Sequence, residues 1–252
     1  MIFNKKTKED FKNLPQEKVL DAYNKANNIT SSVVIRNRED TMINIALNGR
    51  GLNVFSDKET PLEMFLKDYN LIPEHQRKER VLLFDTETTD KYNAYTVSIA
   101  FIIYNIKDGR VEKEFYSLVN PQDIIRADAT EVHGITAEMV ADAPLFDELD
   151  IQEFFDIDMV VGHNVEFDLK VIEREFQRLN KVNPLLDVDV FDTMHMAKEI
   201  VQALDVKGKI KNPRLDECVA HFQIPEEDGA FHNALYDTKQ CLEVFKKLTS
   251  AL

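Results

Sequence analysis

The sequence predicts an α/β fold in which a mixed central sheet carries helices on both faces, with a small and mostly helical N-terminal extension. Three observations support this prediction. Short apolar runs typical of buried strands recur between residues 81 and 192. Two later segments repeat apolar side chains at helical spacing. Strands and helices that alternate in this way along a chain are typical of α/β domains.

Three strands are predicted first, one directly after another. VLLF at 81–84 is a short apolar run, YTVSIAFIIYN follows at 95–105, and VEKEFYSLVN follows at 111–120. The Asp-Gly pair at 108–109 is typical of a hairpin-like turn. We therefore expect the second and third strands to be joined by a tight turn.

Strand and helix then alternate. DMVV at 158–161 and DVDVFD at 187–192 are predicted as short strands. The helix between them is indicated by Phe167, Val171, Ile172, Phe176 and Leu179. The apolar positions of the last helix are Ala234, Leu235, Cys241, Leu242, Phe245 and Leu248. This order is typical of a mixed sheet with helices on both faces.

Residues 1–80 are predicted to form an extension of unknown role, and residues 81–252 the main domain. Within the extension, helices are expected at 14–26 and 60–72. The second expectation is the better supported. Thr60 is a candidate N-cap, Pro61 suits the first helical position, and Glu63 completes a capping box.

Charge is distributed unevenly along the chain, whose formal net charge is −14. Residues 1–80 hold 14 Lys+Arg and 12 Asp+Glu, whereas residues 81–252 hold 17 and 33. Such an acidic domain is a poor general polyanion binder. The basic segment KGKIKNPR at 207–214 either touches a substrate backbone or is a solvated loop.

No apolar run is long enough for a signal peptide or a membrane span, so we expect a cytoplasmic protein without a membrane partner. Cys218 and Cys241 lie in apolar helical patterns and are expected to be buried free thiols, which suits a reducing compartment.

Four acidic residues and one histidine lie in three short blocks. FDTETT at 84–89 carries Asp85 and Glu87, HNVEFDLKVI at 163–172 carries Asp168, and HNALYD at 232–237 carries His232 and Asp237. Residues two apart on a strand share a face, so the carboxylates of Asp85 and Glu87 are expected side by side. Two such carboxylates repel unless a proton or a cation lies between them.

Each block also has an ordinary structural interpretation. A strand end rich in acids is commonly solvated, and Asp168 could simply favour a helix N-terminus. Five residues of helix turn through about 140°, so His232 and Asp237 face alike only if His232 precedes the helix. His163 is expected to be structural.

Beyond the acids, further segments match a known family in order and spacing: VHGIT at 132–136, FDTMHMAKEI at 191–200 and LDECVAHFQI at 215–224. Over roughly residues 80–250 the sequence resembles the DEDDh family of 3′–5′ exonucleases. It is most similar to the proofreading branch, the epsilon-type subunits of bacterial DNA polymerase III. His at position 232 with Asn at 233 favours the branch that uses histidine. Asp90 stands where the family often has glycine.

The resemblance implies a ribonuclease H-like fold and hydrolysis of DNA from single-stranded or mispaired 3′ ends, which releases nucleoside 5′-monophosphates. It also implies two Mg²⁺ or Mn²⁺ ions held by Asp85, Glu87, Asp168 and Asp237. His232 would act as the general base. Thr88, Thr89, His133 and Phe167 would lie beside the terminal nucleotide.

Three alternatives remain open. One is a 3′–5′ exoribonuclease that trims RNA, because discrimination depends on contacts to the 2′-hydroxyl group. Another is a subunit that is weak alone and binds a DNA polymerase, or a second copy of itself, through residues 1–80. The third is a non-catalytic nucleic-acid adaptor, which an absence of metal-dependent activity would reveal.

Overall fold

A computed structural model of the chain describes residues 31–36, 42–48, 51–55, 60–71, 79–225 and 232–250. The chain divides into two compact units, Met1–Asp68 and Tyr69–Leu252. The boundary predicted at residue 80 stays a prediction.

The first unit contains an antiparallel sheet that the sequence analysis did not predict. Its strands are β1 (Ser31–Arg36), β2 (Met42–Asn48) and β3 (Gly51–Phe55), in that order. The Asn-Gly pair at 48–49 is a hairpin signal, and β2 and β3 pair from Asn48 and Gly51 onward. The described part of the extension therefore holds more strand than helix residues, and the mostly helical character expected of the whole extension stays a prediction. The helix expected at 14–26 lies outside the described residues.

Helix α3 (Pro61–Leu71) begins where the sequence predicts. The backbone N–H of Thr60 donates to Glu63 Oε2 over 2.7 Å, and the N–H of Glu63 donates to Thr60 Oγ1 over 3.2 Å. These reciprocal bonds satisfy two backbone donors at the helix start. The predicted capping box is thus confirmed.

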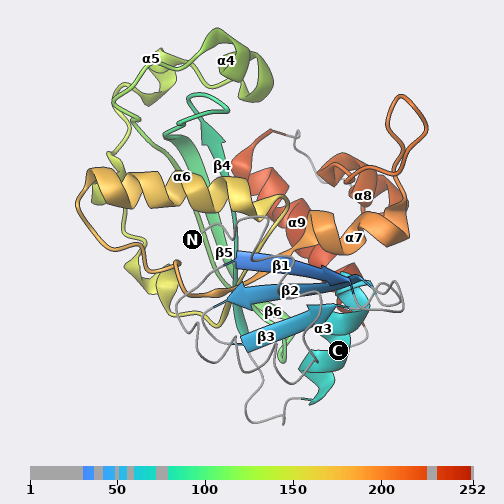
Figure 1. Cartoon of the computed structure of the whole chain (residues 1–252). Helices are drawn as coiled ribbons and strands as arrows, with labels where there is room; N and C mark the ends of the chain where they lie inside the picture. The colour runs from blue at the N-terminus through green and yellow to red at the C-terminus, as the bar shows by residue number, and fades with distance from the viewer. Residues whose placement is uncertain are drawn as a thin grey trace. The chain divides into compact units, whose positions relative to one another are not determined.

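The second unit is built on a mixed five-stranded sheet in the order β6-β5-β4-β7-β8 (Figure 1). The strands are β4 (Arg80–Thr88), β5 (Thr96–Asn105), β6 (Arg110–Leu118), β7 (Met159–Gly162) and β8 (Asp189–Asp192). The pairs β4–β5 and β5–β6 are antiparallel, whereas β4–β7 and β7–β8 are parallel. Gly109, with φ of 64°, lies in the predicted turn between β5 and β6. The predicted mixed sheet is confirmed.

Helices cover both faces of this sheet, as predicted. The main ones are α6 (Val165–Arg178), α7 (Thr193–Val201), α8 (Leu215–His221) and α9 (Ala234–Leu248). Phe101 of β5 belongs to the same core cluster as Ile172 and Phe176 of α6. Tyr104 alternates to the other face, where its ring meets Phe245 of α9 edge-on with centroids 6.5 Å apart. Every residue of β5 is buried between these layers.

Two short helices lie beyond the ends of β4 and β5, at the top of Figure 1. They are α4 (Ala127–His133) and α5 (Ala137–Val140). Two 3₁₀ turns, Phe146–Glu148 and Gln152–Phe155, complete the path from α5 to β7. Within the described residues, no helix is long and apolar enough to cross a membrane.

Gly162 allows α6 to start close to the sheet. A Cβ atom at this position would lie 2.7 Å from Cβ of Val165, in the first turn of α6. We expect Gly162→Ala to destabilise the protein by about 1–3 kcal/mol, because the added methyl group must push a helix and not a flexible side chain. Urea unfolding measures this change. An unchanged midpoint and slope would contradict the close packing seen here.

Candidate active site

Three carboxylates meet at the carboxyl end of β4. Asp85 and Glu87 project from this strand, and Asp237 comes from the first turn of α9, which packs against β4. Each offers an oxygen atom, and these three atoms all lie within 4.8 Å of one another. Glu87 is buried, while Asp85 and Asp237 are partly exposed. The strand alternation that pairs Asp85 with Glu87 therefore places both beside an acid that lies 152 and 150 residues later in the chain, respectively.

Asp168 lies in the first turn of α6 and is almost fully buried, at 4% exposure. Its Oδ1 accepts hydrogen bonds from the backbone N–H of Thr86 over 3.0 Å and from the hydroxyl group of Thr86 over 2.6 Å. These bonds hold the carboxylate against β4, between the positions of Asp85 and Glu87 in the chain. After burial itself, the charge of Asp168 contributes most to raising the pKa of Asp85.

Burial and mutual repulsion raise the pKa values of these acids. Burial raises the pKa of Asp85 well above its usual range, and the charges of Asp168, Glu87 and Asp237 add to the rise. Burial and the charges of Asp237 and Asp168 raise the pKa of Glu87 to about 8. Burial raises the pKa of Asp237 to about 6, against the opposing hydrogen bond from the N–H of His232. Near neutral pH the group therefore needs a proton or a cation.

The donor set fits hard divalent cations. Asp237 Oδ1 is buried and has no hydrogen-bond partner among the described residues, although a buried polar atom normally has one. A cation held between the carboxylates would satisfy it. Carboxylate oxygens are the ligands that Mg²⁺ and Mn²⁺ prefer.

A pH-dependent stability follows from the raised pKa values. Carboxyl groups in an unfolded chain titrate near pH 4, whereas those of Asp237 and Glu87 titrate at about 6 and about 8 in the folded protein. The unfolded chain therefore loses its protons first. The free energy of unfolding of the metal-free protein should fall as the pH rises from about 4 to about 8.

Cations should reverse this loss most strongly at high pH, where protons no longer compete for the carboxylates. With Mn²⁺ at about 100 times its dissociation constant, we expect the free energy of unfolding to rise by about 2.7 kcal/mol, which raises Tm by roughly 5–10 °C. Thermal unfolding in EDTA and in Mn²⁺, at pH 5.5 and pH 8, measures both effects. If Mn²⁺ raised Tm by the same amount at the two pH values, the assignment of these carboxylates as ligands would be contradicted.

His232 precedes the last helix. Helix α9 begins at Ala234, with Asn233 as its N-cap, whose Oδ1 accepts from the N–H of Tyr236 over 3.1 Å. His232 has a φ of 68°, and its backbone N–H donates to Asp237 Oδ2 over 3.0 Å. The residue is exposed and not part of the helix. Because His232 precedes the helix, the rotation of about 140° over five helical residues does not separate it from Asp237.

His133 is held as a neutral ring. Its Nδ1 accepts from the N–H of Ile135 over 3.0 Å, so Nε2 carries the proton and donates to the carbonyl oxygen of Thr88 over 3.1 Å. Burial lowers the pKa of His133, and the charge of His232 lowers it further. His133 thus ties the end of α4 to the end of β4 and lies near His232.

Thr88 and Thr89 use their polar atoms within the loop that follows β4. The Thr88 hydroxyl donates to the carbonyl oxygen of Asp90 over 2.8 Å, and Thr89 Oγ1 accepts from the N–H of Tyr95 over 3.1 Å. Asp90 turns its own carboxylate back on this loop, where it accepts from the N–H of Lys91 over 2.6 Å. Asp90 has no positive φ, so this loop does not need the glycine that the family often carries there.

Phe167 is half-buried and lines a hollow of about 490 Å³ beside the start of α6. The other lining residues are Lys91, Tyr92, Asn93, Asn164, Glu166, Lys170, Val171 and Arg174. This hollow offers aromatic, amide and cationic groups next to Asp168. None of the three predicted metal ligands on β4 and α9 lines it.

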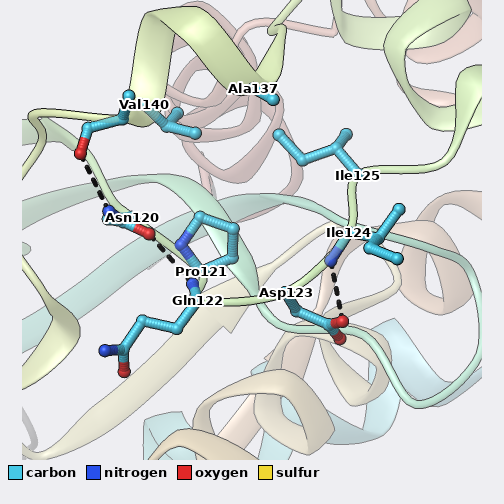
Figure 2. A pocket seen from close by; sticks show the side chains of 9 residues that line it. Asn120, Pro121, Gln122, Asp123, Ile124, Ile125, Ala137 and Val140 are labelled. Atoms are coloured by element: carbon cyan, nitrogen blue, oxygen red, sulfur yellow. Dashed lines mark hydrogen bonds between the residues drawn. The ribbon is translucent and has the colours of Figure 1, made fainter.

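A second hollow, of about 480 Å³, contains none of the predicted site residues. Figure 2 shows Pro121 and Ile125 from the loop after β6, with Ala137 and Val140 of α5 beside them. The side chain of Asn120 orders this loop by accepting from the N–H of Gln122 over 3.0 Å. We assign it no part in the chemistry of the carboxylates.

The basic segment at 207–214 is a loop in which two of the basic side chains are paired with acids. Lys211 and Arg214 form ion pairs with Glu217 and Asp216, respectively. Asp205 Oδ1 accepts from the N–H groups of Lys207 and Lys209 over 2.8 and 2.9 Å. These contacts suit the interpretation as an ordered, solvated loop.

Known proteins resemble this chain over the same region. A sequence model of the family described as Exonuclease matches residues 82–245. The PolC-type DNA polymerase III of Oceanobacillus iheyensis is 29% identical over 189 residues, covering 73% of this chain. The epsilon subunit of DNA polymerase III from Pasteurella multocida is 29% identical over 182 residues, covering 68% of each chain. The matched region spans only 12% of the length of the PolC-type relative.

Solved structures share the fold. Exonuclease X in complex with 5′ overhanging duplex DNA superposes with a TM-score of 0.51 at 24% identity, covering 68% of this chain and 93% of that one. Escherichia coli exonuclease I in complex with a dA16 oligonucleotide gives a TM-score of 0.57 at 16% identity, and the match covers 69% of this chain and 42% of that one. The mixed sheet and its flanking helices thus form the same fold as these solved exonuclease structures.

Proposed function

Since the chain belongs to the exonuclease family, we propose that it removes nucleotides one at a time from the 3′ end of DNA. The observation that carries this proposal is the convergence of three carboxylates, one with a buried oxygen atom that lacks a partner. DNA is favoured as the substrate because the relatives are named as DNA polymerase III proteins and because two structural neighbours hold DNA.

Asp85, Glu87 and Asp237 would hold one Mg²⁺ or Mn²⁺ ion, and Asp85 together with Asp168 a second. When bound, such ions neutralise the phosphate charge and make a bound water more acidic. The chain's own contribution is to hold four carboxylates at one sheet end. Asp168 is oriented for this task by its two bonds from Thr86.

His232 would accept a proton from the attacking water. A neutral imidazole has a free nitrogen for this purpose near neutral pH. As the water oxygen bonds to phosphorus, the bond from phosphorus to the 3′ oxygen of the preceding nucleotide breaks. The released nucleotide keeps the phosphate as a nucleoside 5′-monophosphate. The backbone bond from His232 to Asp237 supports this role, because it ties the base to a proposed ligand.

The terminal nucleotide would lie between the loop after β4 and the start of α6. Phe167, which lines the hollow there, is proposed to contact a base or sugar. Thr88, Thr89 and His133 are proposed to shape this subsite through the backbone they hold in place. Residues 1–80 are the proposed contact for a DNA polymerase or for a second copy of the chain.

Matched 5′-labelled oligonucleotides test the proposal. Single-stranded DNA, DNA with a mispaired 3′ end and single-stranded RNA of the same sequence would each be incubated with the protein in Mg²⁺, Mn²⁺ or EDTA. We expect a ladder that shortens from the 3′ end, is lost in EDTA and is fastest on DNA. Faster cleavage of RNA would assign the chain to RNA trimming. No cleavage of any substrate would overturn the proposed activity.

A further inference from the structure

Asp192 lies outside the carboxylate cluster but contacts the segment that carries Asp168. It ends β8, and its exposure is 9%. Its Oδ1 accepts two backbone hydrogen bonds, from Asn164 over 3.0 Å and from Met194 over 2.9 Å. One carboxylate oxygen therefore joins the start of α7 to the start of α6.

Asn164 is the residue from which α6 starts. It has a left-handed backbone, with φ of 66° and ψ of 39°, and its own side chain makes no capping bond. Its carbonyl oxygen accepts from the N–H of Phe167 over 3.0 Å. A non-glycine residue in this conformation persists where its surroundings hold it. The bond from Asn164 to Asp192 is one such restraint, and Asp168 follows one residue after Phe167.

The neighbouring contacts secure the same corner. Thr193 Oγ1 lies 3.0 Å from the carbonyl oxygen of Gly162 and 3.0 Å from His163 Nδ1. His163 Nε2 lies 3.0 Å from the carbonyl oxygen of Pro213. Both ring nitrogens of His163 therefore contact groups of the fold, which suits the structural role expected of this residue. The segment from 162 to 164 is clamped against the end of β8, its partner in the parallel sheet.

We propose that Asp192 is a positioning residue for the cation site. By accepting the N–H of Asn164 it sets where α6 starts, and so where the carboxylate of Asp168 meets β4. This inference rests on the proposed function, because it assigns Asp168 a part in holding a cation.

Asp192 also caps α7 and contacts His195 Nδ1 over 3.1 Å. Loss of a cap alone costs about 1 kcal/mol of stability. A purely structural role would therefore lower Tm and leave cation binding unchanged. The two roles separate in a measurement of metal affinity.

Asp192→Asn and Asp192→Ala form the matched pair for this test. Asparagine keeps an Oδ1 that can accept both N–H groups, and its amide can donate to His195. Alanine removes both acceptors. Thr60→Ala, which removes the N-cap of α3, controls for the loss of a cap away from the carboxylates.

Mn²⁺ binding by calorimetry in the absence of nucleic acid is the first readout, followed by cleavage of single-stranded DNA across Mn²⁺ concentrations. Loss of a group that orients a metal ligand typically weakens affinity by about 10–100-fold. We expect this loss for Asp192→Ala, with a matching rise in the Mn²⁺ concentration that gives half-maximal rate. For Asp192→Asn and Thr60→Ala we expect changes within about threefold, well below that range.

Unchanged Mn²⁺ affinity in a folded Asp192→Ala variant would overturn the positioning role. Equal losses in the Asn and Ala variants would overturn it as well, because charge and not position would then be responsible. A wild-type protein that binds Mn²⁺ yet cleaves no nucleic acid would instead count against the proposed function. The role of Asp192 would still be decided by the calorimetric comparison of the variants.

Discussion

Turnover in the Asp85→Asn variant is expected to fall by about 10³-fold or more, while the protein stays folded. Cations at such sites supply several kcal/mol of transition-state stabilisation, and each 1.36 kcal/mol corresponds to a factor of ten in rate. Asp85 would contact both ions, so its replacement should affect both. Initial rates on labelled single-stranded DNA in saturating Mn²⁺ measure the change.

The same substitution should stabilise the metal-free protein at pH 8. The carboxylate of Asp85 is repelled by Asp168, Glu87 and Asp237, and asparagine removes that repulsion without changing the shape. Thermal unfolding in EDTA measures this gain. Asp90→Asn is the matched control, because the Asp90 carboxylate contacts the N–H of Lys91 and the side chain of Arg126 and is not among the charges that raise the pKa of Asp85. A variant that retained most of its activity in saturating Mn²⁺ would refute the metal assignment.

Removal of the His232 imidazole is expected to slow cleavage by about 10²–10⁴-fold, the usual contribution of a general base. The effect should appear in kcat with little change in KM, because the proposed role concerns the attacking water and not substrate binding. Mn²⁺ affinity should also be kept, since the bond from position 232 to Asp237 is made by the backbone N–H. Single-turnover rates of His232→Ala across pH 6–9 measure the loss.

His221→Ala provides the control for this second prediction. His221 is exposed at the end of α8 and stacks edge-on against Phe222, with ring centroids 5.0 Å apart. Its removal should leave the rate unchanged. A His232→Ala rate within a fewfold of the wild type at neutral pH would exclude the residue as the base.

Local sequence patterns predicted most of the second unit. The apolar run before Asp85 became β4, the Asp-Gly pair became the turn before β6, and the apolar spacing after Asp168 became α6. These features depend on neighbours a few residues apart, which periodicity and turn chemistry record. The first unit shows the limit of this approach. The Asn-Gly pair at 48–49 lies between β2 and β3, which pair with each other, so this hairpin had a local signal that the prediction did not use.

The sequence by itself determined the acidic blocks, the side-by-side placement of Asp85 and Glu87, and the strand or helix on which each block lies. Only the tertiary structure decided which residues orient those acids. The bond from Thr86 to Asp168 spans 82 residues, and the bond from Asn164 to Asp192 spans 28. The first depends on the pairing of β4 with β7, which skips β5 and β6, and the second depends on the parallel pairing of β7 with β8. Periodicity records only near neighbours, so contacts made across adjacent strand ends required the folded chain.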